Sequence, residues 1–136
     1  MALLVGSLTR SAVIALLEAE TDLTVYPDGA PDLAQPPYVT AWLSTDLEDP
    51  DRLEASTNRR WWRLTTHSVG RTPELALRVA DLVGAALLDQ RPAVAGAPVT
   101  RIRHNNGRPP VTDESTGVTV SDIVDQWTWQ SWPTRS

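Results

Sequence analysis

The sequence contains no cysteine, no lysine and no phenylalanine. Without cysteine the chain can form neither a disulfide scaffold nor a thiolate-ligated zinc or iron–sulfur site. The formal net charge of −5 argues against a general nucleic-acid coat, which normally carries an excess of positive charge. The apolar start is interrupted by Arg10 before a signal-peptide core forms, and no run approaches the ~20 apolar residues of a membrane span. These absences predict a soluble protein of the cytoplasm, or of a particle assembled there.

Tryptophan supplies most of the aromatic surface that the sequence does have. The 136 residues include six tryptophans and only two tyrosines. This length fits the soft prior of roughly 150 residues per domain, and it is enough to bury a core without staples. We therefore expect one domain over residues 1–136, with extended loops at 27–37, 46–60 and 105–117.

Two segments have the hydrophobic periodicity of helices. Ser7–Glu20 carries apolar residues over a wide stripe, which favours a well-buried helix. A second helix is expected after Thr72, which suits the N-cap, with Pro73 in the first turn and an end near Asp89. Its predicted apolar stripe comprises Leu75, Val79, Leu82, Val83, Ala86 and Leu87.

The remaining apolar segments are typical of strands. Asp46–Arg60 holds five acids and has no strong pattern, so we expect a long solvated arm there. Asp122 and Asp125 suggest a bulge in the last strand, or two strands in succession. Together the elements predict an α+β fold, in which a mostly antiparallel sheet of four to five strands has two helices packed on one face. The predicted strands are Leu23–Tyr26, Tyr38–Thr45, Trp61–Val69, Val99–His104 and Val118–Trp132.

Residues for catalysis or metal binding are few. His67 and His104 are the two histidines, and neither has metal-ligand spacing or a convergent partner, so we expect structural roles. No serine lies in a nucleophile elbow, and no glycine-rich loop could hold a phosphate. The acids at 46–51 do not match a calcium-binding loop. The sequence therefore predicts neither an enzyme nor a cofactor or metal site.

One basic cluster comprises Arg101, Arg103, His104 and Arg108, next to two asparagines. With nearby tryptophans, such a cluster can stack on and neutralise single-stranded nucleic acid. It can also be a charged strand edge that blocks pairing, or a protein–protein contact. The acidic net charge favours these last two alternatives.

The tryptophans and arginines point to protein contacts, because both residue types are enriched at interface hot spots. Trp61 and Trp62 must face opposite sides of their strand, so one enters the core and the other meets a neighbouring element or subunit. For each tryptophan, either the core or a partner's surface covers the ring. The candidate interface residues are Trp61, Trp62, Trp127, Trp129, Trp132, Arg59, Arg60, Asp49 and Asp51.

The order of these elements resembles the tail terminator (tail completion) proteins of long-tailed phages, over nearly the whole chain. The matching features are the helix Ser7–Glu20, the Tyr-Pro-Asp-Gly turn at 26–29 and the strand Trp62–His67. They continue with the capped helix Arg71–Leu88 and a final strand after Asp113–Gly117.

The resemblance implies a non-enzymatic structural protein of the virion tail or neck, assembled in the host cytoplasm. Such proteins form a hexameric ring that caps the tail tube, ends its polymerisation and joins it to the head connector. The implied partners are further copies of the chain, the tail tube protein and a head-side connector or stopper, without cofactor or membrane. DNA would pass through the lumen without specific binding, which fits the acidic balance. A ring needs two different adhesive faces, and we expect the 46–60 arm and the C-terminal tryptophan strand to supply some contacts.

Two other classes stay open at this point. One is another neck component, such as a head–tail connector or stopper. The other is a small bacterial α+β enzyme or ligand-binding domain. A stable monomer with a deep polar pocket would favour the second class, whereas binding to tail-tube ends or to portal-side proteins would separate a terminator from a connector.

Overall fold

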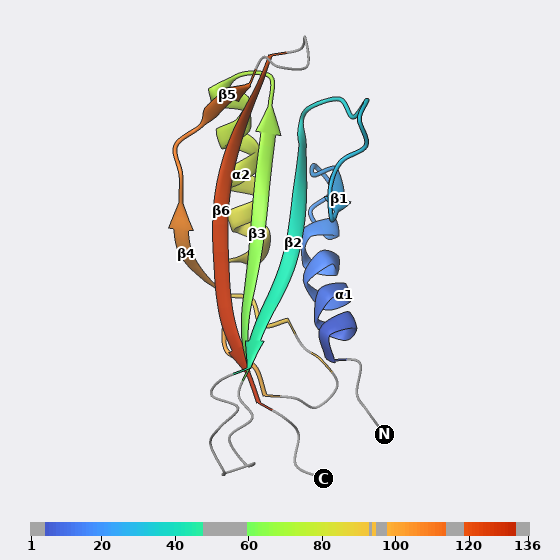
Figure 1. Cartoon of the computed structure of the whole chain (residues 1–136), viewed down its shortest axis with the longest axis vertical. Coiled ribbons are helices and arrows are strands. Elements are labelled where there is room, and N and C mark those ends of the chain that lie inside the picture. Colours follow the sequence, from blue (N-terminus) through green and yellow to red (C-terminus); the bar gives the residue numbers. More distant parts are fainter. Residues whose placement is uncertain (1–4, 48–59, 93, 95–97, 114–118, 133–136) are drawn as a thin grey trace.

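The computed structural model describes residues 5–47, 60–92, 94, 98–113 and 119–132, which form two helices and six strands (Figure 1). This is the predicted α+β class, with a mixed, mostly antiparallel sheet. The elements are α1 (Val5–Glu18), β1 (Val25–Pro27), β2 (Tyr38–Leu47), β3 (Arg60–Gly70), α2 (Pro73–Leu87), β4 (Arg103–Gly107), β5 (Val111–Asp113) and β6 (Val120–Ser131).

Three long antiparallel strands form the centre of the sheet. The strand order is β1-β2-β3-β6-β4, and β5 also pairs with β6. Strand β1 runs parallel to β2, whereas the other pairs are antiparallel. Because β4 and β5 pair with successive parts of the same long strand, β6 has neighbours along most of its length (Figure 1).

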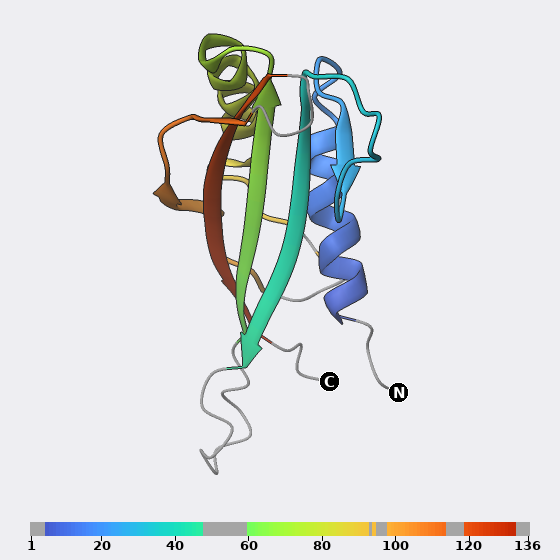
Figure 2. The same ribbon diagram turned by 45° about the horizontal axis from the view of Figure 1, so that its top comes forward.

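Both helices pack on the same face of the sheet (Figures 1 and 2). Helix α2 lies across β3 and β6, and α1 lies beside β1 and β2. The Leu75 N–H donates to the Thr72 side-chain oxygen at 3.1 Å, which confirms the predicted N-cap. Leu75 itself is 37% exposed, and Leu82 and Ala86 are only partly buried, so the buried stripe of α2 is narrower than predicted. The buried residues are Ala76, Val79, Val83 and Leu87.

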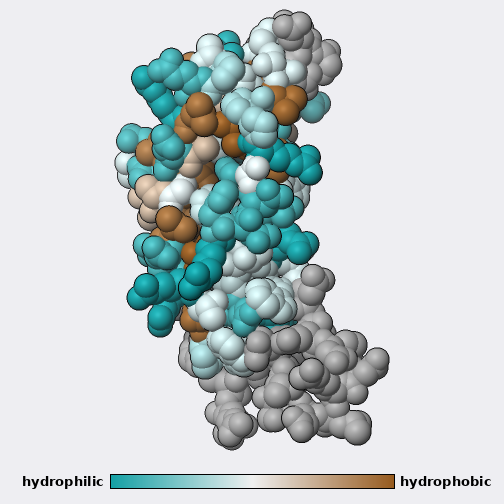
Figure 3. Space-filling model, turned by 90° about the vertical axis from the view of Figure 1, so that its left-hand side faces the viewer, coloured by the Kyte–Doolittle hydropathy of each residue, from teal (hydrophilic) through white to brown (hydrophobic). Residues whose placement is uncertain are grey.

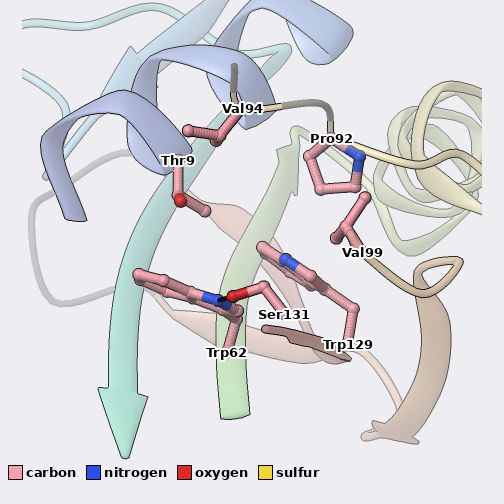
Figure 4. A pocket seen from close by; sticks show the side chains of 7 residues that line it. All are labelled: Thr9, Trp62, Pro92, Val94, Val99, Trp129 and Ser131. Atoms are coloured by element: carbon pink, nitrogen blue, oxygen red, sulfur yellow. Dashed lines mark hydrogen bonds between the residues drawn. The ribbon is translucent and has the colours of Figure 1, made fainter. Parts of the chain in front are cut away.

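Tryptophans form a large part of the core between the layers. The Trp62 and Trp129 rings stack with their centroids 6.5 Å apart, and Trp127 lies beside them on the same sheet face. The Trp62 indole N–H donates to Ser131 at 2.8 Å and the Trp127 indole N–H to Thr66 at 3.0 Å, which satisfies these two buried indoles. Figure 4 shows the stacked pair below α1, lining a cavity of only about 10 Å³. The core is therefore closely filled at this point.

The region after α2 departs most from the sequence prediction. The strand expected over Val99–His104 is reduced to an isolated bridge at Val99, and β4 begins only at Arg103. Asn105–Gly107, expected as a turn, lies within β4, and the register shifts between His104 and Asn106. The exposed edge of β6 supplies hydrogen-bond partners here, and this tertiary pairing overrides the local turn preference.

Strand β6 is continuous across both of its aspartates. The irregularity expected near Asp122 and Asp125 lies instead in the partner strand β4. The expected loop after Pro110 also contains a short strand, β5. The ends of the predicted arm, at 46–47 and at Arg60, belong to β2 and β3, and residues 48–59 lie outside the described residues. Neither helix in the described part of the chain has the length and hydrophobicity needed to cross a membrane.

Candidate functional site

The sheet face that points away from the helices is the candidate functional surface, called the open face below. Opposed residues of paired strands share a face, and Trp42, Thr65 and Gln126 form one such row across β2, β3 and β6. Trp42 is 40% exposed and Trp61, on the same face, is 42% exposed. The open face therefore presents two large aromatic side chains that the described chain does not bury.

A histidine–aspartate pair lies on the open face near the C-terminal end of β3. The His67 Nδ1 and Asp122 Oδ2 atoms are 2.8 Å apart, and the His67 ring meets Trp42 edge-on at 5.1 Å. Burial, and then the Asp122 carboxylate, raise the pKa of the nearby Tyr38 hydroxyl. Tyr38 and Asp122 border a cleft of about 450 Å³, whose described lining comprises Tyr38, Val69, Val111, Thr112, Val120 and Asp122.

The second histidine makes an equivalent bond on the other side of β6. The His104 Nε2 and Asp125 Oδ1 atoms are 2.8 Å apart, and the His104 ring meets Trp127 edge-on at 4.9 Å. Each histidine therefore has a carboxylate partner and an aromatic neighbour within the fold, which corrects the expectation that neither would have a convergent partner. Among the described residues, no three potential metal ligands come together.

A second cleft, of about 520 Å³, lies on the open face near the N-terminal end of β3 and the C-terminal end of β6. It is called the arginine cleft below. Two of the arginines from the basic cluster, Arg101 and Arg103, lie in it, whereas His104 turns to Asp125. Arg108 is not among the lining residues. The described lining comprises Trp61, Arg91, Val99, Thr100, Arg101, Arg103, Thr128 and Gln130.

The structure divides the candidate tryptophans between core and surface. Trp62, Trp127 and Trp129 are 1%, 4% and 2% exposed, so the core alternative holds for these three. Their rings face the helices because β3 and β6 alternate with a period of two. Trp61 points to the open face, and the partly buried Trp132 donates its backbone N–H to the Pro98 carbonyl oxygen at 3.1 Å.

The other candidate residues are charged. The Arg60 guanidinium lies 5.8 Å from the centroid of the Trp62 ring, a cation–π distance within the chain itself. Asp49, Asp51 and Arg59 lie outside the described residues. They remain candidates on the basis of sequence alone.

Two residues of the open face were missed from sequence. Trp42 could have been found, because the apolar residues Val39, Ala41 and Leu43 alternate along this strand and so place Trp42 on the opposite face. Arg91 could not have been found in this way. It lies in the segment after α2, which ends at Leu87, and it joins the cleft only through the tertiary packing of residues 98–103.

In the described part of the chain, the fold is an α+β fold with two helices over one face of a six-stranded sheet. The other face of the sheet carries exposed tryptophan and arginine side chains. No family model matches the sequence, and no curated protein matches it. Among solved structures, the chain is similar to one chain of the "Virion of native gene transfer agent (GTA) particle". The TM-score is 0.72 at 14% identity, over 97% of this chain and 100% of that chain. The likeness shows a shared fold over nearly the whole of this chain and the whole of the other.

Proposed function

We propose that the chain is a structural subunit of a phage-like virion, and that it forms the hexameric ring that caps the tail tube. In this role it ends tube polymerisation and joins the tail to the head connector, without catalysis. The main support is the fold likeness to a gene transfer agent virion chain, which leaves almost no part of either chain unmatched. The element order that resembles tail terminators adds independent support from the sequence.

The open face supplies one of the two adhesive faces that a ring requires. A cyclic ring is built from heterologous contacts, in which one surface of a subunit meets a different surface of the next. Trp42 and Trp61 are well suited to such a contact, because large exposed aromatics commonly dominate interface energies. The 46–60 segment remains our proposed contributor to the same contacts. Trp129 is withdrawn from that role, since its ring is part of the core.

The charge of the chain suits a passage for DNA. The formal net charge is −5, so a ring of several copies carries a substantial negative charge. Phosphates are held by basic surfaces, and an acidic lumen would therefore let DNA slide. The arginines of the open face then belong to protein contacts, away from the lumen.

The double variant Trp42→Ala/Trp61→Ala tests this assignment of the open face. We expect it to fold, and to lose most of its ring assembly, and with it its binding to the ends of isolated tail tubes, as measured by mass photometry and negative-stain electron microscopy. Trp42→Phe/Trp61→Phe is the matched control, because it keeps aromatic surface at both positions. Unchanged tube-end binding by the alanine variant would contradict the assignment. Binding to portal-side proteins and not to tubes would favour the connector role instead.

A further inference from the structure

The backbone around the arginine cleft fixes the direction in which its arginine side chains point. Arg101 and Arg103 flank Ile102, which is fully buried. Successive residues of an extended chain point to opposite sides, so burying Ile102 turns both arginines outward together. The Ile102 N–H donates to the Gln90 carbonyl oxygen at 2.8 Å. This bond sets Arg91, the next residue after Gln90, beside the other two arginines.

The neighbouring backbone is tied to β6, which fixes the cleft further. The Thr100 N–H donates to the Gln130 carbonyl oxygen at 2.9 Å, and the Gln130 N–H donates back to the Thr100 hydroxyl at 2.9 Å. Val99 bridges to Ser131 at the end of the strand. The cleft walls are therefore preorganised, which lowers the entropic cost of binding.

The three guanidinium groups of the cleft form no salt bridge in the described part of the chain. By contrast, Arg10 pairs with Asp28 and Arg78 with Glu74 elsewhere on the surface. No acidic residue is among the described residues that line the cleft. Three like charges that line one cleft produce a locally positive potential on an acidic protein, and such a potential attracts an anionic group.

The remaining lining completes a site for a peptide. Trp61 offers an exposed ring for packing, and Thr128 and Gln130 offer hydrogen-bonding side chains. A volume of about 520 Å³ lies in the range of ordinary ligand sites. Guanidinium groups bind carboxylates through two parallel hydrogen bonds, which gives geometric specificity as well as affinity.

We propose that the arginine cleft binds an extended protein segment that carries two or more aspartate or glutamate carboxylates. A nucleic acid fits less well, because its charged backbone would continue past the cleft over an acidic chain and toward Asp122 on the same face. Seen from the β4 side, the described surface is mostly hydrophilic, with hydrophobic residues only in small patches, which suits a charged partner (Figure 3). This proposal does not depend on the proposed virion role, because peptide binding can be measured with the isolated chain.

Fluorescence anisotropy with a labelled peptide of alternating glutamate and serine tests the proposal. We expect saturable binding that weakens as salt is added, because exposed charges are screened. Arg101→Gln/Arg103→Gln should weaken binding by about tenfold or more, since each lost charged hydrogen bond is costly. Arg91→Gln, on a different segment, should weaken it in the same direction.

The controls separate a specific site from general charge effects. Arg78→Gln removes one charge from α2, outside the cleft, and should leave binding unchanged. The same peptide with glutamine in place of glutamate should not bind. Equal binding of the glutamine peptide, or equal losses from Arg78→Gln and the cleft variants, would overturn the proposal. Tighter binding of a single-stranded oligonucleotide of matched length would overturn it in favour of a nucleic-acid site.

Discussion

At the residue scale, the absence of phenylalanine gives tryptophan two distinct tasks. Adjacent residues on β3 show this division, because Trp62 is 1% exposed and Trp61 is 42% exposed. The same residue type therefore fills the core at one position and forms accessible surface at the next. The difference follows from strand alternation, and it predicts very different consequences of truncation.

Trp129→Ala should destabilise the protein by about 3–5 kcal/mol, because it opens a cavity in the core and removes the ring stacked on Trp62. Trp61→Ala should change the free energy of unfolding by less than about 1 kcal/mol in the isolated chain, because its ring is already partly hydrated. Urea denaturation monitored by circular dichroism measures both. An equal loss of unfolding free energy in the two variants would contradict the division between core and surface tryptophans.

The second prediction concerns Tyr38 and the dependence of stability on pH. Burial and the Asp122 carboxylate raise the pKa of its hydroxyl above the ordinary 10.0, so the folded state holds this proton more tightly than the unfolded state. The resulting stabilisation is fully present below about pH 10 and is lost as the pH rises through the folded-state value. In the Tyr26→Phe variant, where Tyr38 is the one tyrosine left, absorbance at alkaline pH should give a midpoint above 10.0.

Adding Asp122→Asn to that variant should lower the midpoint, because it removes the second cause of the shift. The melting temperature of the wild type should also fall more steeply than that of Tyr38→Phe as the pH rises past 10. A midpoint at or below 10.0 would show that Tyr38 is not buried as described.

At the scale of elements, sequence patterns were most informative where a segment contains its own signals. Helix α2 has an N-cap, a first-turn proline and a long apolar stripe, and it forms nearly where these signals place it. The long strands β2, β3 and β6 were also predictable from their β-branched and aromatic content. Strands β4 and β5 were not, because Asn105–Gly107 is extended only through pairing with β6.

The junction between β3 and α2 depends on a glycine. A Cβ atom at Gly70 would approach the Ala76 nitrogen and come within 2.7 Å of the Leu75 carbonyl carbon, both of them backbone atoms of α2. Since backbone cannot yield as a side chain can, Gly70→Ala should destabilise the fold by about 1–3 kcal/mol. Thermal and urea unfolding measure the change.

Gly6→Ala in α1 is the matched control for this junction. A Cβ atom there meets nothing within 4 Å, and alanine favours helix, so the variant should be as stable as the wild type or up to about 1 kcal/mol more stable. If both substitutions had the same effect, steric crowding at Gly70 would not be its cause.

At the scale of the whole molecule, the two faces of the sheet differ in a way that explains both stability and function. The helices cover one face and seal the tryptophan core, while the open face keeps Trp42, Trp61 and the arginine cleft accessible. Sequence analysis identified Trp61 and part of the basic cluster. It could not predict that Arg91 lines the cleft, or which tryptophans lie in the core, because both depend on tertiary packing between distant segments.

The location of the chain in an assembled particle tests the central claim most directly. Antibodies against this chain, conjugated to gold, can be applied to particles purified from cells that express it and observed by electron microscopy. We predict gold at the head-proximal end of the tail tube, where a terminating ring must sit. Intact particles without label at that end, with the chain remaining as a free monomer, would contradict the proposed function.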